Sequence, residues 1–269
     1  MNEELNNSDN NYLRRNNNNT DLENCSVIEQ ENTVFESSAS DVEQSLSDTL
    51  EAEPKVIGIR PNLKRAEIAQ ILIWAVMAIE IVEMGSDYLQ LLLLESVQKG
   101  EEVTDVMIAS NDSRVQLVAI SYLVLFVISA FTFIQWFRRA YYNLSLRTSC
   151  TYGEGWAAGG WFVPFMNLLR PYRIMTELST KTTNLINIKS RNTVEDNSFI
   201  IGLWWTLWII GNFASKLITR RNADSDTIEG LLKSTQFDIV LSAFFIPLSI
   251  VTVLMIKSYS KKEEILNEL

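Results

Sequence analysis

Four apolar runs, each close in length to the thickness of a bilayer core, constrain this 269-residue chain more than any other feature. They cover residues 68–84, 115–134, 199–218 and 237–256. A helix needs roughly 20 apolar residues to cross a bilayer, and helices satisfy their own backbone hydrogen bonds inside lipid. The sequence therefore predicts an all-α fold, a polytopic membrane helical bundle with about four transmembrane helices, over residues 55–269.

A shorter apolar segment, residues 155–173, lies between the second and third runs and contains Pro164. Its apolar part is too short for a span and belongs to the length class of re-entrant or interfacial segments. Basic residues flank the segment on both sides, and basic residues favour the cytoplasmic face. We therefore expect a re-entrant or interfacial segment, with both chain termini in the cytoplasm. A five-span topology, in which this segment crosses, stays open.

The first 54 residues differ in composition from the rest of the chain. They hold 13 acidic residues against Arg14 and Arg15, whereas the remainder is close to neutral, so the formal charge of −10 belongs to this tail. The tail is rich in Asn and Ser and has few aromatic residues, so it cannot bury enough apolar surface to offset its chain entropy. The sequence predicts a disordered, acidic, cytoplasmic tail, which could recruit a cytoplasmic protein.

The composition excludes several kinds of chemistry. The chain has no histidine, which removes His-ligated metals and His-dependent nucleophilic catalysis. Its two cysteines, Cys25 and Cys150, form neither a disulfide framework nor a metal-ligand spacing. Basic residues occur in small groups beside the apolar runs, so no nucleic-acid partner is indicated. We expect no catalytic residues, no metal site and no cofactor.

Two acidic residues, Glu80 and Glu83, lie within the first apolar run. Together with Asp87 they share one helix face, and a carboxylate inside hydrocarbon must face a polar interior, pair with a cation or be protonated. One hypothesis is an ion or proton path, or a counter-charge for Arg138 or Lys216. The other is that the helix has nearly reached the headgroups at Glu83, which leaves only Glu80 at depth.

Arg170, Arg173 and Glu177 follow the proline of the middle segment at helical spacing. The two guanidinium groups could grip an anionic lipid headgroup, since their planar fork suits phosphate. The alternative is a pair of basic anchors at the membrane edge, with Glu177 as the partner of Arg173 one helical turn away.

The motif of the middle segment resembles a known family. FRRAYYNL over residues 137–144, WFVPFMNLLRPY over 161–172, and the later Trp204-Trp205 pair look like the domain of unknown function 4328 family of bacterial integral membrane proteins. The resemblance implies a membrane domain in a bacterial inner membrane with no established activity. It also implies an architectural or functional role for six motif residues: Trp161, Pro164, Asn167, Arg170, Pro171 and Tyr172.

Three functions stay open on the sequence alone. The first is a non-enzymatic scaffold or regulatory membrane component. The second is a small transporter or channel, which with four spans would have to form a homo-oligomer. The third is a protein that handles lipid headgroups.

Overall fold

The computed structural model describes residues 58–190, 194–222 and 227–269, and this part of the chain is helical with no strand. The predicted disordered tail, residues 1–54, lies outside the described residues. The elements in chain order are α2 (Leu63–Gln98), α3 (Asp105–Ser145), α4 (Gly155–Gly159), the 3-10 turn η1 (Met166–Leu168), α5 (Arg170–Ser190), α6 (Ser198–Asn222) and α7 (Ile228–Glu268).

Four of these helices, α2, α3, α6 and α7, are long and apolar enough to cross a membrane. Each contains one of the four apolar runs, which confirms the predicted all-α fold with about four transmembrane helices. The chain therefore forms a polytopic membrane bundle. The helices exceed the runs at both ends, because helix continues through polar residues once a core-spanning segment has nucleated it.

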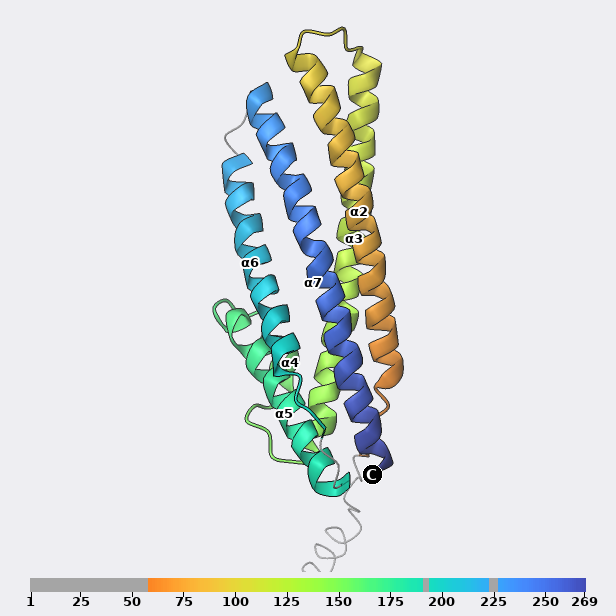
Figure 1. Ribbon diagram of the computed structural model, residues 1–269, viewed down its shortest axis with the longest axis vertical. Coiled ribbons are helices and arrows are strands. Elements are labelled where there is room, and N and C mark those ends of the chain that lie inside the picture. Colours follow the sequence, from red (N-terminus) through yellow and green to blue (C-terminus); the bar gives the residue numbers. More distant parts are fainter. Residues whose placement is uncertain (1–57, 191–193, 223–226) are drawn as a thin grey trace, which may run out of the picture. The chain divides into compact units, whose positions relative to one another are not determined.

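The four long helices pack in the order α3, α2, α7, α6 (Figure 1). Helix α2 lies against both α3 and α7, and α7 lies against α6. Helices α3 and α6 stand at the two ends of this order and are not substantially packed on each other. The bundle is thus closed on three sides and less tightly closed between α3 and α6.

The middle segment lies at the end of the bundle that holds the carboxyl terminus (Figure 1). It consists of α4, η1 and the first turn of α5, so the described residues contain no fifth spanning helix. Phe165, directly after Pro164, has a positive φ of 64°, a backbone conformation that is uncommon for a residue other than glycine. Helix α5 then runs along the bundle end, where it contacts α3, α6 and α7.

Two polar segments are more helical than their hydropathy indicates. Hydropathy assigns residues 99–111 to a loop, but α3 begins at Asp105. The Thr104 side chain accepts a hydrogen bond from the Met107 N–H and caps the helix there. The second case is the polar stretch after the middle segment, which hydropathy leaves unassigned and which is mostly α5. Its apolar face, with Ile174 and Leu178 fully buried, makes it an amphipathic helix.

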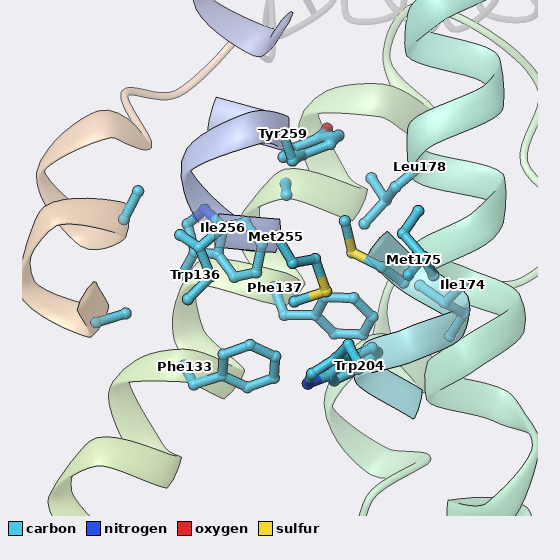
Figure 2. Packing of buried hydrophobic residues seen from close by; sticks show 14 of the residues in the cluster. Phe133, Trp136, Phe137, Ile174, Met175, Leu178, Trp204, Met255, Ile256 and Tyr259 are labelled. Carbon is cyan, nitrogen blue, oxygen red and sulfur yellow. The ribbon is translucent and has the colours of Figure 1, made fainter. Parts of the chain in front are cut away.

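The buried core is concentrated at the α5 end of the bundle. Figure 2 shows side chains from α3, α5, α6 and α7 gathered into one cluster there, including Trp136, Phe137, Met175, Met255 and Tyr259. All five are at most 3% exposed. This core fixes α5 to the spans and closes that end of the bundle.

Candidate functional site

The four long helices line a cavity of about 560 Å³. Small-molecule sites are usually of this size, 300 to 1,000 Å³. All four spans contribute to its walls, and one further residue, Trp161, comes from the middle segment. The cavity is therefore a feature of the assembled bundle that no single helix could form.

The walls contributed by α3 and α6 flank the weakly packed side of the bundle. Phe126 and Ala130 line the cavity from α3, and Trp208 and Asn212 line it from α6. Phe126 is also 49% exposed, so it borders both the cavity and the bundle exterior. A molecule dissolved in the surrounding lipid would meet the cavity on this side.

One end of the cavity is aromatic. Trp161 sits at its centre, with ring centroids 5.6 Å from Phe133, 6.3 Å from Trp204 and 5.8 Å from Trp208 in edge-to-face arrangements. Such geometry is the preferred one for aromatic pairs. The Trp161 indole N–H is buried and has no hydrogen-bond partner. We name these four residues, Phe133, Trp161, Trp204 and Trp208, the aromatic floor.

The other end of the cavity is acidic. Glu80 is only 3% exposed and lines the cavity, and its Oε2 atom is buried without a hydrogen-bond partner. The Ser249 hydroxyl lies within reach of the same carboxyl group. Glu80 thus faces the inside of the bundle and not the lipid. An unmatched buried carboxylate oxygen is energetically costly, so the site calls for a cation or a proton.

Further carboxylates continue from Glu80 away from the floor. Glu83 and Asp238 also line the cavity, and Asp87 lies near both. Arg114 is the basic residue of this region, but its guanidinium donates to Ser86 Oγ at 3.2 Å and to the Ser86 carbonyl at 3.1 Å. Neither of the two suggested counter-charges pairs with Glu80. Arg138 pairs with Glu154 at 3.4 Å, and Lys216 is exposed.

Several residues of the middle-segment motif pack the segment against its neighbours. The Arg170 guanidinium lies over the rings of Tyr152 and Trp156, 4.4 and 4.5 Å from their centroids. Tyr172 stacks on Trp205 at 6.1 Å. Pro171 is buried in the first turn of α5, where a missing N–H costs nothing. Three motif side chains thus tie the segment to its neighbours.

The remaining motif positions contribute less. Pro164 is exposed in the turn before η1, and Asn167 donates its backbone N–H to the Val163 carbonyl at 3.0 Å. Arg173 is exposed, and the expected Arg173–Glu177 pair is wrong: Glu177 pairs with Lys181 at 2.6 Å instead. Arg173 and Lys181 each lie one helical turn from Glu177. Lys181 also donates to the Ser149 carbonyl, and this bond holds the Lys181 side chain against the loop after α3.

Glu177 ties the loop after α3 to α5. Its Oε1 accepts from both the N–H and the hydroxyl of Thr151 at 2.8 Å, and its Oε2 accepts from the Tyr141 hydroxyl at 2.8 Å. Burial alone would raise the pKa of Glu177, but the bonds from Lys181, Thr151 and Tyr141 outweigh it and hold the pKa below its ordinary value. The group is a charged structural latch.

Within the described residues, no group of three or more Asp, Glu, Cys or His side chains is arranged to hold a metal ion. Sequence reasoning missed Asp238 and Ser249, which come from α7 and meet Glu80 only after folding. The sequence signal for these two residues was weak, because it consists only of their being polar residues within an apolar run. Trp204 and Trp208 lie one helical turn apart in the third apolar run, but nothing in the sequence shows that both line a cavity.

The fold and site define a polytopic helical membrane protein with an internal cavity that is aromatic at one end and acidic at the other. The sequence matches the family described as Domain of unknown function (DUF4328) over residues 99–261. Because the match covers more than half of the chain, the protein belongs to this family. No curated protein and no solved structure matches the chain.

Proposed function

We propose that the protein is a non-enzymatic membrane component that binds a small organic molecule in its intramembrane cavity, as the binding unit of a small transporter. One observation supports this most directly: a cavity of ligand size whose wall holds a buried, unmatched carboxylate oxygen on Glu80. A purely structural bundle would gain stability by filling such a space. The transporter hypothesis is therefore placed ahead of the scaffold hypothesis.

The proposed orientation places the α4–α5 end of the bundle in the cytoplasm. Basic residues support it, because they cluster where α2 starts, where α3 and α7 end, and along α5. The middle segment would then lie at the cytoplasmic membrane edge of a bacterial inner membrane. The exposed apolar side chains Phe162 and Phe165, 75% and 84% exposed, suit contact with lipid there.

The cavity can be tested by tryptophan fluorescence, because three of the chain's seven tryptophans line it. The protein in lipid nanodiscs would be titrated with brominated aromatic-alkyl compounds of positive, zero and negative charge. Saturable quenching by at least one of them is the expected result. Ala130→Phe, which fills the cavity from α3, should abolish it, and Ala119→Phe on the exposed side of α3 should not.

Quenching that rises linearly with concentration, and equally in both alanine variants, would mean partitioning into lipid and no binding. The proposed function would then be wrong.

The scaffold role remains a separate proposal that depends on the acidic tail. Removing residues 1–54 should abolish capture of a cytoplasmic partner and leave membrane insertion unchanged if the tail recruits that partner. Anionic headgroup binding by Arg170 and Arg173 has less support, because the Arg170 guanidinium is already engaged with two aromatic rings. A homo-oligomer would complete a transport path that four spans alone are too few to enclose.

A further inference from the structure

The two ends of the cavity differ in chemistry, and this difference specifies a ligand. On α2 the lining runs from Ile73 to Glu83, and on α7 from Thr252 to Asp238. At 1.5 Å rise per residue these stretches are roughly 15 and 21 Å long. The cavity is thus long enough to hold an apolar body at the aromatic floor and a polar head at the acidic end.

The charge at the acidic end is of one sign. The lining residues include Glu80, Glu83 and Asp238, and no lysine or arginine is among them. Arg114 acts electrostatically on Asp87, and its nitrogens donate to Ser86 Oγ and, at 2.6 Å, to Asn111 Oδ1. The unmatched Oε2 of Glu80 therefore has no cation of the protein to pair with.

The floor favours an organic rather than an inorganic cation. Indole and phenyl rings pack against the apolar body of an organic ion, whereas a metal ion has no such body and requires several oxygen ligands at short distance. No such ligand group exists in the part of the chain that the structure describes. Entry between α3 and α6 would further favour a molecule that already partitions into the bilayer.

We propose that the cavity binds an amphiphilic organic cation, with its ammonium head at Glu80 and its apolar body against Trp161, Trp204 and Phe133. This inference rests on the proposed function, because it names the ligand class of the same cavity. Ser249 and Ser242, which also line the cavity, would solvate the head group. An ammonium ion on an alkyl or aromatic body could be a free amphiphile or the headgroup of an amino lipid.

The decisive experiment compares two probes of the same shape. One is a brominated phenylhexyl-trimethylammonium ion, and the other is its neutral isostere, in which tert-butyl replaces trimethylammonium. Both are titrated into the full-length protein in nanodiscs of an uncharged galactolipid, which does not concentrate the cation at its surface, with saturable tryptophan quenching as the readout. We expect the cation to bind roughly 30-fold or more tightly than the isostere, the range found for a desolvated charge pair.

Two variants locate the charge. Glu80→Gln keeps the shape of the side chain and should remove the preference for the cation, while the affinity for the neutral isostere changes less than about threefold. Glu67→Gln removes the same charge from an exposed position on the same helix and should leave both affinities unchanged. Circular dichroism and the unfolding midpoint show whether each variant is folded. The comparison of the two probes on the unmodified protein decides whether the cavity prefers a cation, even if Glu80→Gln fails to fold.

The possible failures are distinguishable. Equal affinity for cation and isostere, both saturable, would overturn this inference and leave the proposed function intact. Absence of saturable quenching by either probe would overturn both. A cation preference that Glu80→Gln does not alter would also refute the assignment of the head group to Glu80. If phosphatidylethanolamine added to the nanodiscs competes with the cationic probe, the natural ligand is an amino-lipid headgroup. If it does not compete, the natural ligand is a free amphiphile. Both results support an ammonium ligand.

Discussion

Two adjacent tyrosines at the end of α3 should respond oppositely to the same change. Tyr141 is fully buried, and its hydroxyl donates to Glu177 at 2.8 Å and accepts from the Tyr152 N–H at 3.0 Å. The Tyr142 hydroxyl is also buried but has no hydrogen-bond partner. Replacement of each tyrosine by phenylalanine removes one oxygen atom and little else.

The magnitude for Tyr141→Phe follows from these two bonds. A hydrogen bond to a charged group contributes about 1.5–3 kcal/mol, and an unsatisfied buried N–H costs about 1–3 kcal/mol. The carboxylate retains its bonds from Thr151 and Lys181, so the two losses should not add in full. We expect Tyr141→Phe to lower the free energy of unfolding by about 2–4 kcal/mol.

Tyr142→Phe removes a hydroxyl that gains nothing from being buried. The Arg60 guanidinium lies 4.7 Å from the centroid of the Tyr142 ring, and phenylalanine keeps that contact. We expect a change between zero and about 1 kcal/mol in the stabilising direction, because the desolvation cost of the hydroxyl disappears.

Unfolding in mixed micelles, driven by increasing sodium dodecyl sulfate and followed by tryptophan fluorescence, measures both values in one set of conditions. The double variant should show the sum of the single effects, since the two hydroxyls have no shared partner. If Tyr141→Phe changed stability by less than about 0.5 kcal/mol, or if both variants lost the same amount, the view of Glu177 as a latch that depends on Tyr141 would be refuted.

Three further outcomes are expected. Gly160→Ala should destabilise the protein, because the added Cβ would lie 2.8 Å from the Trp156 carbonyl oxygen, whereas Gly159→Ala meets nothing within 4 Å; thermal unfolding in detergent compares them. Glu177→Gln should lower the free energy of unfolding at neutral pH. This loss relative to the unmodified protein should shrink as pH falls below about 4.5, because the Glu177 carboxyl protonates first in the unfolded and then in the folded state. A loss that does not change with pH would contradict the charged state of Glu177. In a cysteine-free background, Arg173→Cys should react with an impermeant thiol reagent from one vesicle face and Glu101→Cys from the other, and reaction of both from the same face would contradict the four-span topology.

The spans were predictable from the sequence because lipid imposes a single requirement on them. A run of about 20 apolar residues can satisfy its backbone in hydrocarbon only as a helix, and that requirement does not depend on its neighbours. Helix ends were less predictable. Thr104 caps α3 inside a stretch that hydropathy assigns to a loop, and α5 is too polar for a hydropathy criterion, although its apolar face recurs at helical spacing.

The candidate site was only half visible in the sequence. Glu80 could be singled out because a carboxylate in an apolar run is unusual. Its relation to Ser249 and Asp238 depends on how α2 packs against α7, and no spacing along the chain encodes that. The partner of Glu177 was missed for a similar reason: Arg173 and Lys181 are equally distant along the helix, and only the tertiary contact of Lys181 with Ser149 distinguishes them.

The motif that marks the family acquires a physical explanation from the position of Trp161. This indole forms the floor of the cavity but is carried by a segment with little regular helix, so its position depends on tertiary contacts. Gly160 allows Arg170 to pack against the segment, with the Cβ site of Gly160 only 3.1 Å from the Arg170 Cβ, and Arg170 in turn lies over Trp156. Gly160 and the motif residues Trp161 and Arg170 thus act together at a distance from Glu80. Their common effect is to determine where the cavity ends at Trp161, and under the proposed function this depth would limit the length of the ligand's apolar body.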